Sequence, residues 1–150
     1  MNPNRTQVAY QEAAVRNANP IELVIMLYDI LARDLHGAIE AMEASNIETR
    51  TTKLKHGFLA LQQLEGSLPI EEGGDLAAGM SRFYSMLRAQ MMKAQVQKDP
   101  AILRELIQLL FSVREAWVEL NSRQAVTQEV ATAPASTSAP EQLQSASWKA

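Results

Sequence analysis

The sequence predicts an all-α protein: an antiparallel up-down four-helix bundle, with a short N-terminal segment packed on it and a disordered C-terminal tail. Apolar residues recur at steps of three and four in four stretches of about 20 residues, which is the period of an amphipathic helix. Short turns separate most of these stretches, and short connections place consecutive helices antiparallel. The apolar residues are mainly Leu, Ala, Met and Ile, most of which are good helix formers.

The first helix is predicted from Pro20 to about residue 44, and its start is well marked. Asn19 can cap the first turn, Pro20 suits the first helical position, and Glu22 favours the positive end of the helix. One apolar stripe then follows at helical spacing: Val24, Leu27, Leu31, Leu35, Ala38 and Met42. A second apolar face occupies the first half only, at Leu23, Met26 and Ile30. A bundle core needs only one apolar face of a helix. The excess therefore indicates that this part of the helix contributes both to the core and to a binding groove on the surface.

The second helix is predicted to start at a capping box, since Ser45 and Glu48 fit the pattern S-x-x-E, and to stop by Pro69. Residues 71–75, Glu-Glu-Gly-Gly-Asp, are typical of an acidic, flexible loop. The third helix follows, and its apolar stripe runs from residue 76 to residue 94. The longest connection in the bundle is therefore expected between the second and third helices.

Asp99-Pro100 repeats the cap-plus-proline pattern and starts the fourth helix. A residue before proline is disfavoured in the α region, so Asp99 also ends the third helix and the turn is very short. After residue 123 Ala, Ser, Thr, Pro and Gln dominate, which predicts a disordered tail with Trp148 as its one aromatic residue. The chain is thus divided into a lid segment (1–18), a bundle domain (19–123) and a tail (124–150).

The composition excludes several classes of function. The chain has no cysteine, so it has no disulfide framework and no thiolate nucleophile or thiolate metal site. The net charge is −3 with dispersed Lys and Arg, which is not the basic stripe of a nucleic-acid-binding protein. No secretory signal and no run of about 20 apolar residues is found. We therefore expect a cytosolic protein without a membrane span and without a nucleic-acid partner.

Sequence motifs of catalysis are missing, so we expect neither an enzyme nor a cofactor. There is no glycine-rich phosphate loop and no G-x-S-x-G elbow. A di-iron bundle needs Glu-x-x-His pairs, and neither His36 nor His56 has such a glutamate. A histidine phosphotransfer domain resembles H-x-L-K-G, whereas here the lysines precede His56. The acidic residues of 71–75 lack the ligand spacing of a calcium loop, so no metal site is expected.

Four short motifs stand out between Gln7 and about Arg123: Val8-Ala9-Tyr10, Asn19-Pro20 followed by Leu23 to Asp29, Gly73 to Ala77 with Phe83-Tyr84, and Glu115-Ala116-Trp117. In this order and spacing they resemble the motifs of one known family, the flagellar export chaperones usually called FliS. One departure is Asn19, which stands where the family usually has a serine and is chemically equivalent as a cap. A second is Ser85, after the Phe-Tyr pair, where the family commonly has an aspartate.

The resemblance implies a cytosolic bundle that binds the disordered C-terminal segment of flagellin, which wraps the bundle and becomes partly helical. Binding would prevent premature polymerisation and deliver flagellin to the flagellar type III export apparatus. The N-terminal segment would cover part of the groove when flagellin is absent. The residues expected to form the lid or to bind flagellin are Val8, Tyr10, Leu23, Met26, Leu27, Tyr28, Ile30 and Tyr84.

Other partners stay open at the level of the sequence. Some members of the family also contact a membrane component of the export gate. An exposed apolar groove makes a homodimer plausible. An alternative function is a helical bundle that binds another secretion or regulatory partner, and a histidine phosphotransfer domain is a more distant one.

Overall fold

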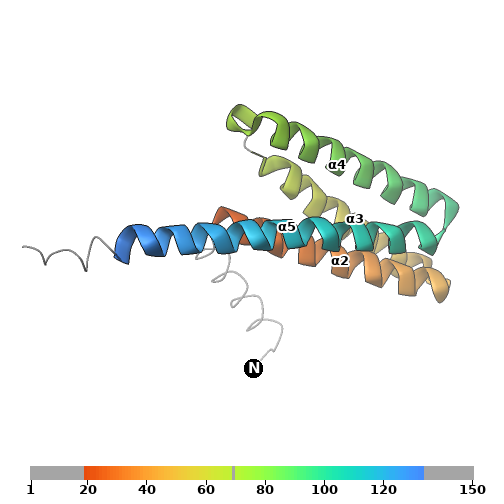
Figure 1. Ribbon diagram of the computed structural model, residues 1–150. Helices are drawn as coiled ribbons and strands as arrows, with labels where there is room; N and C mark the ends of the chain where they lie inside the picture. Colours follow the sequence, from red (N-terminus) through yellow and green to blue (C-terminus); the bar gives the residue numbers. More distant parts are fainter. Residues whose placement is uncertain (1–18, 69, 134–150) are drawn as a thin grey trace, which may run out of the picture.

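The computed structural model describes residues 19–68 and 70–133, and places them in four α-helices. Figure 1 shows α2 (Pro20–Glu43), α3 (Ile47–Gly66), α4 (Ile70–Gln97) and α5 (Pro100–Ala133). These ranges contain no strand, so the all-α prediction is confirmed. The predicted lid (1–18) and residues 134–150 of the predicted tail lie outside the described residues.

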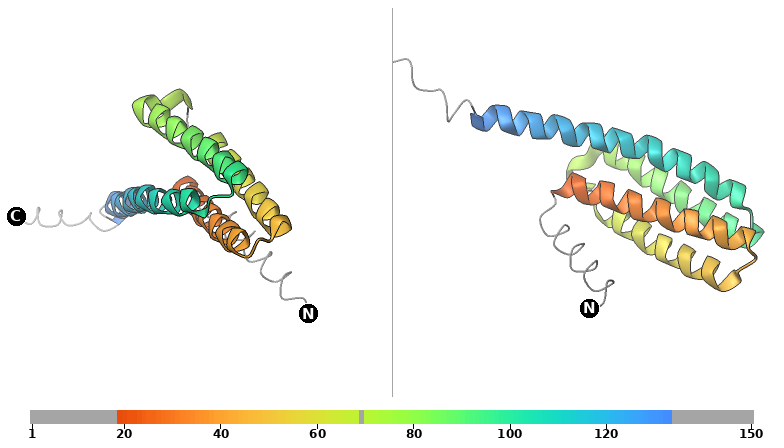
Figure 2. Two further views of the ribbon diagram at one scale, coloured as in Figure 1. Left: turned by 90° about the vertical axis from the view of Figure 1, so that its right-hand side faces the viewer. Right: turned by 90° about the horizontal axis from the view of Figure 1, so that it is seen from below.

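Consecutive helices run antiparallel, and the views of Figure 2 show the chain going up and down the bundle. α2 packs on α3 and on α5, and α4 packs on the same two helices. Each helix therefore contacts the next one in the chain, and the last returns to the first. This is the up-down four-helix bundle that the apolar stripes and short turns predict.

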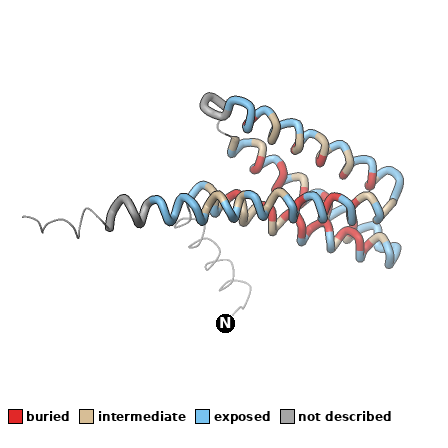
Figure 3. The backbone as a smooth tube through the Cα atoms, viewed as in Figure 1, coloured by how far each residue is buried: buried red, intermediate tan, exposed pale blue. Residues whose placement is uncertain are grey.

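The core consists mainly of aliphatic side chains, among which leucine is the most frequent. Figure 3 shows the buried residues on the sides of the helices that face one another. Gly57 lies where α3 approaches α2 and α4. A Cβ at Gly57 would lie 3.3 Å from Leu31 Cδ1 and 3.3 Å from Met91 Cε, so the absence of a side chain permits this approach. The core leucines that are fully inaccessible to solvent are Leu31, Leu35, Leu61, Leu87 and Leu103.

The turns before α3 and α5 are built in the same way, and one of them corrects a prediction. The predicted cap Ser45 instead has φ of +55° and ends α2 in the left-handed conformation, while Asn46 caps α3 by accepting from Thr49 N at 3.0 Å. At the other turn Lys98 also has φ of +55°, and Asp99 accepts from the backbone of the first turn of α5 at 3.0 Å. At both turns, therefore, a residue with positive φ ends one helix, and the residue after it caps the next helix.

The predicted acidic loop at residues 71–75 is also corrected. α4 already starts at Ile70 and is interrupted at Gly74, whose φ of +52° and ψ of −131° are not helical. Because glycine adopts positive φ at little cost, the chain can kink here and resume the helix immediately. The second connection is therefore short, and it brings the residues after Gly74 close to the end of α3.

α5 is longer than the sequence predicts, since it runs to Ala133 rather than ending near residue 123. Residues 124–133 include Ala, Gln and Glu, which have good helix propensity, although they lack an apolar stripe. Extending an existing helix avoids the unfavourable nucleation step, so these residues need no packing partner to stay helical. Figure 1 shows this end of α5 projecting past the other helices.

Candidate partner-binding site

An apolar cavity of about 410 Å³ lies at the end of the bundle where α2 begins, and we call it the end cavity. Its wall is formed by α2, α4 and α5 together with the turn after α3. Ser67 is its one residue with a polar side chain. The lining residues are Pro20, Ile21, Leu23, Val24, Ser67, Leu68, Leu76, Ala77, Met80 and Trp117. An apolar wall of this kind suits apolar side chains of a partner rather than a polar substrate.

The capping box of α2 fixes one side of the end cavity. Asn19 Oδ1 accepts from Glu22 N at 2.8 Å, and Asn19 N donates to Glu22 Oε1 at 3.5 Å. Asn19 Nδ2 also donates to Asn121 Oδ1 of α5 at 3.2 Å. The start of α2 is therefore held against α5, which places the first turn of α2 at the rim.

The kink of α4 fixes the opposite side. Gly74 directs the chain so that Leu76, Ala77 and Met80 line the cavity beside Leu68. Leu76 is 61% exposed, so a large apolar side chain stands at the rim without a core to cover it. Exposed apolar side chains that gather around a concave surface mark interaction sites.

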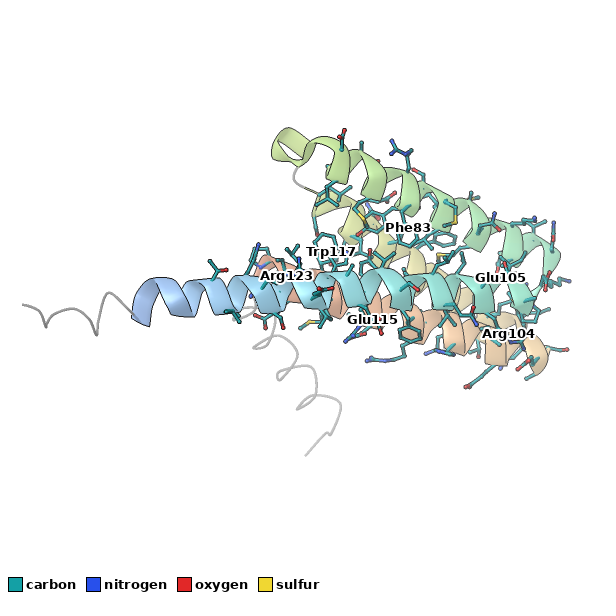
Figure 4. The ribbon with its side chains drawn as sticks, viewed as in Figure 1. Phe83, Arg104, Glu105, Glu115, Trp117 and Arg123 are labelled. Carbon is teal, nitrogen blue, oxygen red and sulfur yellow. The ribbon has the colours of Figure 1, made fainter. Side chains whose placement is uncertain are left out.

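An aromatic hydrogen-bond network joins the cavity to the core. Trp117, which lines the cavity, donates its indole N–H to the Tyr28 hydroxyl at 3.3 Å. The hydroxyls of Tyr28 and Tyr84 share a hydrogen bond of 3.0 Å, and their rings pack edge to face with centroids 6.3 Å apart. Figure 4 shows Trp117 of α5 and Phe83 of α4 pointing into the space between the two helices. The network ties α2, α4 and α5 together directly below the cavity.

Burial raises the pKa of Tyr28 above its ordinary value of 10.0, although hydrogen bonds with Tyr84 and Trp117 act in the opposite direction. Burial also raises the pKa of Tyr84 strongly, and its hydrogen bond with Tyr28 adds to this increase. Both phenols therefore keep their protons at pH values where the unfolded chain has lost them.

This difference predicts a loss of stability at alkaline pH. Above about pH 10 the unfolded chain binds fewer protons than the folded one, so the free energy of unfolding falls as pH rises. Tyr84→Phe removes one of the two buried phenols, and should reduce the slope of that fall by up to about 1.4 kcal/mol per pH unit. Urea unfolding of both proteins between pH 9 and about pH 11 measures the slope. Equal slopes would contradict the assignment of raised pKa values to this pair.

A second contact between α2 and α5 lies next to the network. Arg114 donates from Nε to Asp29 Oδ1 at 2.6 Å and from Nη2 to Asp29 Oδ2 at 3.1 Å, which is a bidentate pair. These bonds raise the pKa of Arg114, while burial acts in the opposite direction. The pair fixes the register of α5 on α2, and so the position of Trp117 at the cavity.

The comparisons with known proteins agree on one family. The family model described as "Flagellar protein FliS" matches residues 2–124. The chain belongs to the FliS family. Similar relatives include the flagellar secretion chaperone FliSB of Pseudomonas aeruginosa, 30% identical over 106 residues, which are 71% of this chain and 84% of the relative. The flagellar secretion chaperones FliS of Vibrio cholerae and Bacillus subtilis are 26% and 28% identical, over 75% and 73% of this chain and 85% and 80% of each relative.

The residues expected to bind flagellin lie in different environments in this FliS-family bundle. Leu23 lines the end cavity, and Met26 is half-buried. Leu27 and Ile30 pack against the core cluster while staying partly accessible. The tyrosines Tyr28 and Tyr84 are each 1% exposed, so in this structure they present almost no surface to a partner. Val8 and Tyr10 lie outside the described residues.

Several residues of the end cavity were not among the predicted site residues. In the sequence, Val24, Leu76, Met80 and Trp117 belong to the apolar stripes expected to form the core. Only the packing of the helices in three dimensions shows that these residues also line a cavity. Val24 belongs to the core cluster, and Met80 and Trp117 pack against it, so these residues line the cavity at the edge of the core. The motif Glu115-Ala116-Trp117 was the best available signal, because it marked Trp117 independently of its stripe.

His56, considered above for phosphotransfer, has a structural contact in this FliS-family bundle. Its Nδ1 lies 2.5 Å from Oδ2 of Asp34, an α2 residue that is only 5% exposed.

Among the residues that the structure describes, no group of three or more His, Cys, Asp or Glu could hold a metal ion. The described helices also include none that is long and apolar enough to cross a membrane.

His56→Ala is expected to lower the free energy of unfolding by about 1–3 kcal/mol, because it removes the hydrogen-bond partner of a buried carboxylate. His36→Ala is the matched control, since His36 is exposed on α2 and should change stability by less than about 0.5 kcal/mol. Chemical denaturation followed by circular dichroism measures both values. Equal losses would show that Asp34 does not depend on His56.

Proposed function

We propose that this chain is a cytosolic export chaperone whose end cavity binds the C-terminal segment of flagellin. The observation that carries the proposal is an apolar cavity, open to solvent, in a chain of the FliS family. The similar relatives are flagellar secretion chaperones, and flagellin is the secreted client that the resemblance implies. Binding would prevent premature polymerisation of flagellin and deliver it to the export apparatus without covalent chemistry, cofactor or enzyme activity.

The shape of the site favours an amphipathic helix as the bound form. Such a helix presents apolar anchors at positions i, i+3, i+4 and i+7, and a groove between helices accepts them in turn. Leu23, Leu76 and Trp117 come from three different helices and surround the space that such anchors would fill. A client segment that is disordered beforehand becomes ordered on binding, so part of the interaction energy is spent on its folding.

The predicted lid fits the same site. Asn19 is the first described residue and its neighbour Pro20 lines the cavity, so the chain before Asn19 connects to the bundle beside the cavity. Val8 and Tyr10 would supply apolar side chains that cover part of the groove when flagellin is absent. The export-gate contact and a homodimer stay expectations from the resemblance, since no described feature favours either one.

Titration calorimetry with a peptide of the last forty or so residues of the organism's own flagellin tests the proposal. We expect saturable binding with a negative heat-capacity change, because apolar surface is buried, and a gain of helicity in circular dichroism. A peptide of the same composition in scrambled order is the control. No binding by the folded protein would overturn the flagellin assignment and favour the alternative, a bundle for another secretion or regulatory partner.

A further inference from the structure

The projecting end of α5 determines where the last part of the chain starts. Asn19 hydrogen-bonds to Asn121 of α5, and residues 122–127, which follow on α5, are exposed. The helix continues to Ala133, and 17 residues, 134–150, follow it. Those residues extend beyond the part matched by the family model, which ends at residue 124.

We propose that residues 134–150 fold back along α5 and place Trp148 in the end cavity. The C-terminal segment would then be an intramolecular occupant that competes with a client for the same apolar wall. Occupation of the cavity by Trp148 does not depend on the proposed function. The consequence for flagellin binding does rest on it.

The length of the segment matches the distance that it has to cover. From Trp117, at the cavity, to Ala133, α5 rises by about 24 Å at 1.5 Å per residue. The 15 residues from Ala133 to Trp148 could span at most about 50 Å when fully extended. For a flexible chain of this length, the root-mean-square end-to-end distance is about 20 Å. The effective concentration of a tethered group is greatest when this length matches the span, and it is then in the millimolar range for short linkers.

The sequence of the segment divides into a spacer and an anchor. Residues 134–140, Pro-Ala-Ser-Thr-Ser-Ala-Pro, carry no large side chain that would compete for a place on the bundle. The large apolar side chains, Leu143 and Trp148, both lie in the last eight residues. A tryptophan combines a large apolar ring with one N–H donor, and so needs an apolar wall with a single acceptor.

The end cavity offers such a combination. Its wall is apolar except for Ser67, whose hydroxyl donates to Gln63 O at 2.7 Å. The Ser67 oxygen can therefore still accept a hydrogen bond from an indole N–H. Exposed Glu22 and Asp75 are next in sequence to lining residues, and Lys149 follows Trp148, so the charges at the rim are complementary.

A spin label tests this placement directly, because the chain has no cysteine and Ala150→Cys creates a single attachment site. With methionine methyl groups observed by NMR, we expect the label to broaden the Met80 signal of the end cavity. The Met42 signal is the internal control, since Met42 lies near the other end of α2. Adding Trp148→Ala to the labelled chain should restore the Met80 signal to at least half of its unlabelled intensity.

Each other outcome overturns the proposal. Equal effects on Met80 and Met42 would mean that the segment does not favour the cavity, and would leave the cavity to residues 1–18 or to a client. Broadening that appears only when labelled chains are mixed with unlabelled, isotope-enriched chains would assign the occupant to a second copy. Broadening of Met80 that persists with Trp148→Ala would exclude the tryptophan as the anchor.

The consequence for the client is measured separately. If Trp148 occupies the cavity for an appreciable fraction of the time, Trp148→Ala should raise the affinity for the flagellin peptide about twofold to tenfold. Unchanged affinity, with peptide binding intact, would overturn the competition. If the peptide binds neither protein, the proposed function fails, while the spin-label result for Trp148 still stands.

Discussion

Replacing Leu31 with alanine is expected to lower the free energy of unfolding by about 3–5 kcal/mol. Leu31 is 0% exposed and belongs to the core cluster. Its Cδ1 lies 3.3 Å from the position that a Cβ would take at Gly57, so α3 already approaches α2 closely at this point. The helices therefore cannot move together enough to fill the space that the shorter side chain leaves. Chemical denaturation followed by circular dichroism measures the loss.

Leu59→Ala is the matched control for this prediction. Leu59 lies on α3 and is 52% exposed, so the same substitution removes little buried surface and should cost less than about 1 kcal/mol. A loss below about 1 kcal/mol for Leu31→Ala as well would show that the bundle repacks to fill the space that the leucine side chain leaves. In that case the position of Gly57 would not constrain the core.

Replacing Leu76 with glutamate is expected to weaken binding of the flagellin peptide at least about a hundredfold while leaving the bundle folded. Leu76 lines the end cavity yet is 61% exposed, so a carboxylate there costs the free protein little. In the complex the same carboxylate would be covered by apolar groups of the client and would lose its hydration, which is unfavourable by several kcal/mol. Titration calorimetry measures the affinity.

Val96→Glu separates this effect from a general change of α4. Val96 is on the same helix and is 78% exposed, but it does not line the end cavity. We expect the affinity of this variant to stay within about threefold of the parent protein. If the two glutamates weakened binding equally, the client would contact α4 along its length, and the end cavity would not be the main site.

The parts of the fold that the sequence predicted well are those set by local chemistry and periodicity. Asn19-Pro20 and Asp99-Pro100 both start helices, because a side-chain acceptor and a proline act within one turn of the chain. The errors arose where two local signals competed. Ser45 has the residue type of a cap, but it closes α2, and Asn46 takes the capping position. Gly74 was interpreted as part of a loop, whereas it forms a single kink within α4.

The end of α5 was missed for a different reason. The stripe that predicts a helix depends on packing, and residues 124–127 of α5 are exposed. Helix propensity and continuation of an existing helix decide their conformation instead. A sequence pattern that reports on burial cannot show where such a solvent-exposed helix ends.

The candidate site was predicted only in part, because its geometry depends on how α2, α4, α5 and the turn after α3 meet. The second apolar face of the first helix indicated Leu23, and Leu23 lines the end cavity. Nothing in the stripes separates Met80 and Trp117 from core residues, since position relative to the end of the bundle is a tertiary property. The signature residues Tyr28 and Tyr84 hydrogen-bond to each other, and their position beneath the cavity suggests that they hold its wall in place.

Methionine methyl NMR during titration with the flagellin peptide can show whether flagellin binds at the end cavity. Met80 lines the cavity, and Met92 is 57% exposed on the same helix outside it. We predict a large, saturable shift of the Met80 methyl signal with little change at Met92. A saturable shift at Met92 with Met80 unchanged would place the client on another face of the bundle, and the end cavity would then not be the flagellin site.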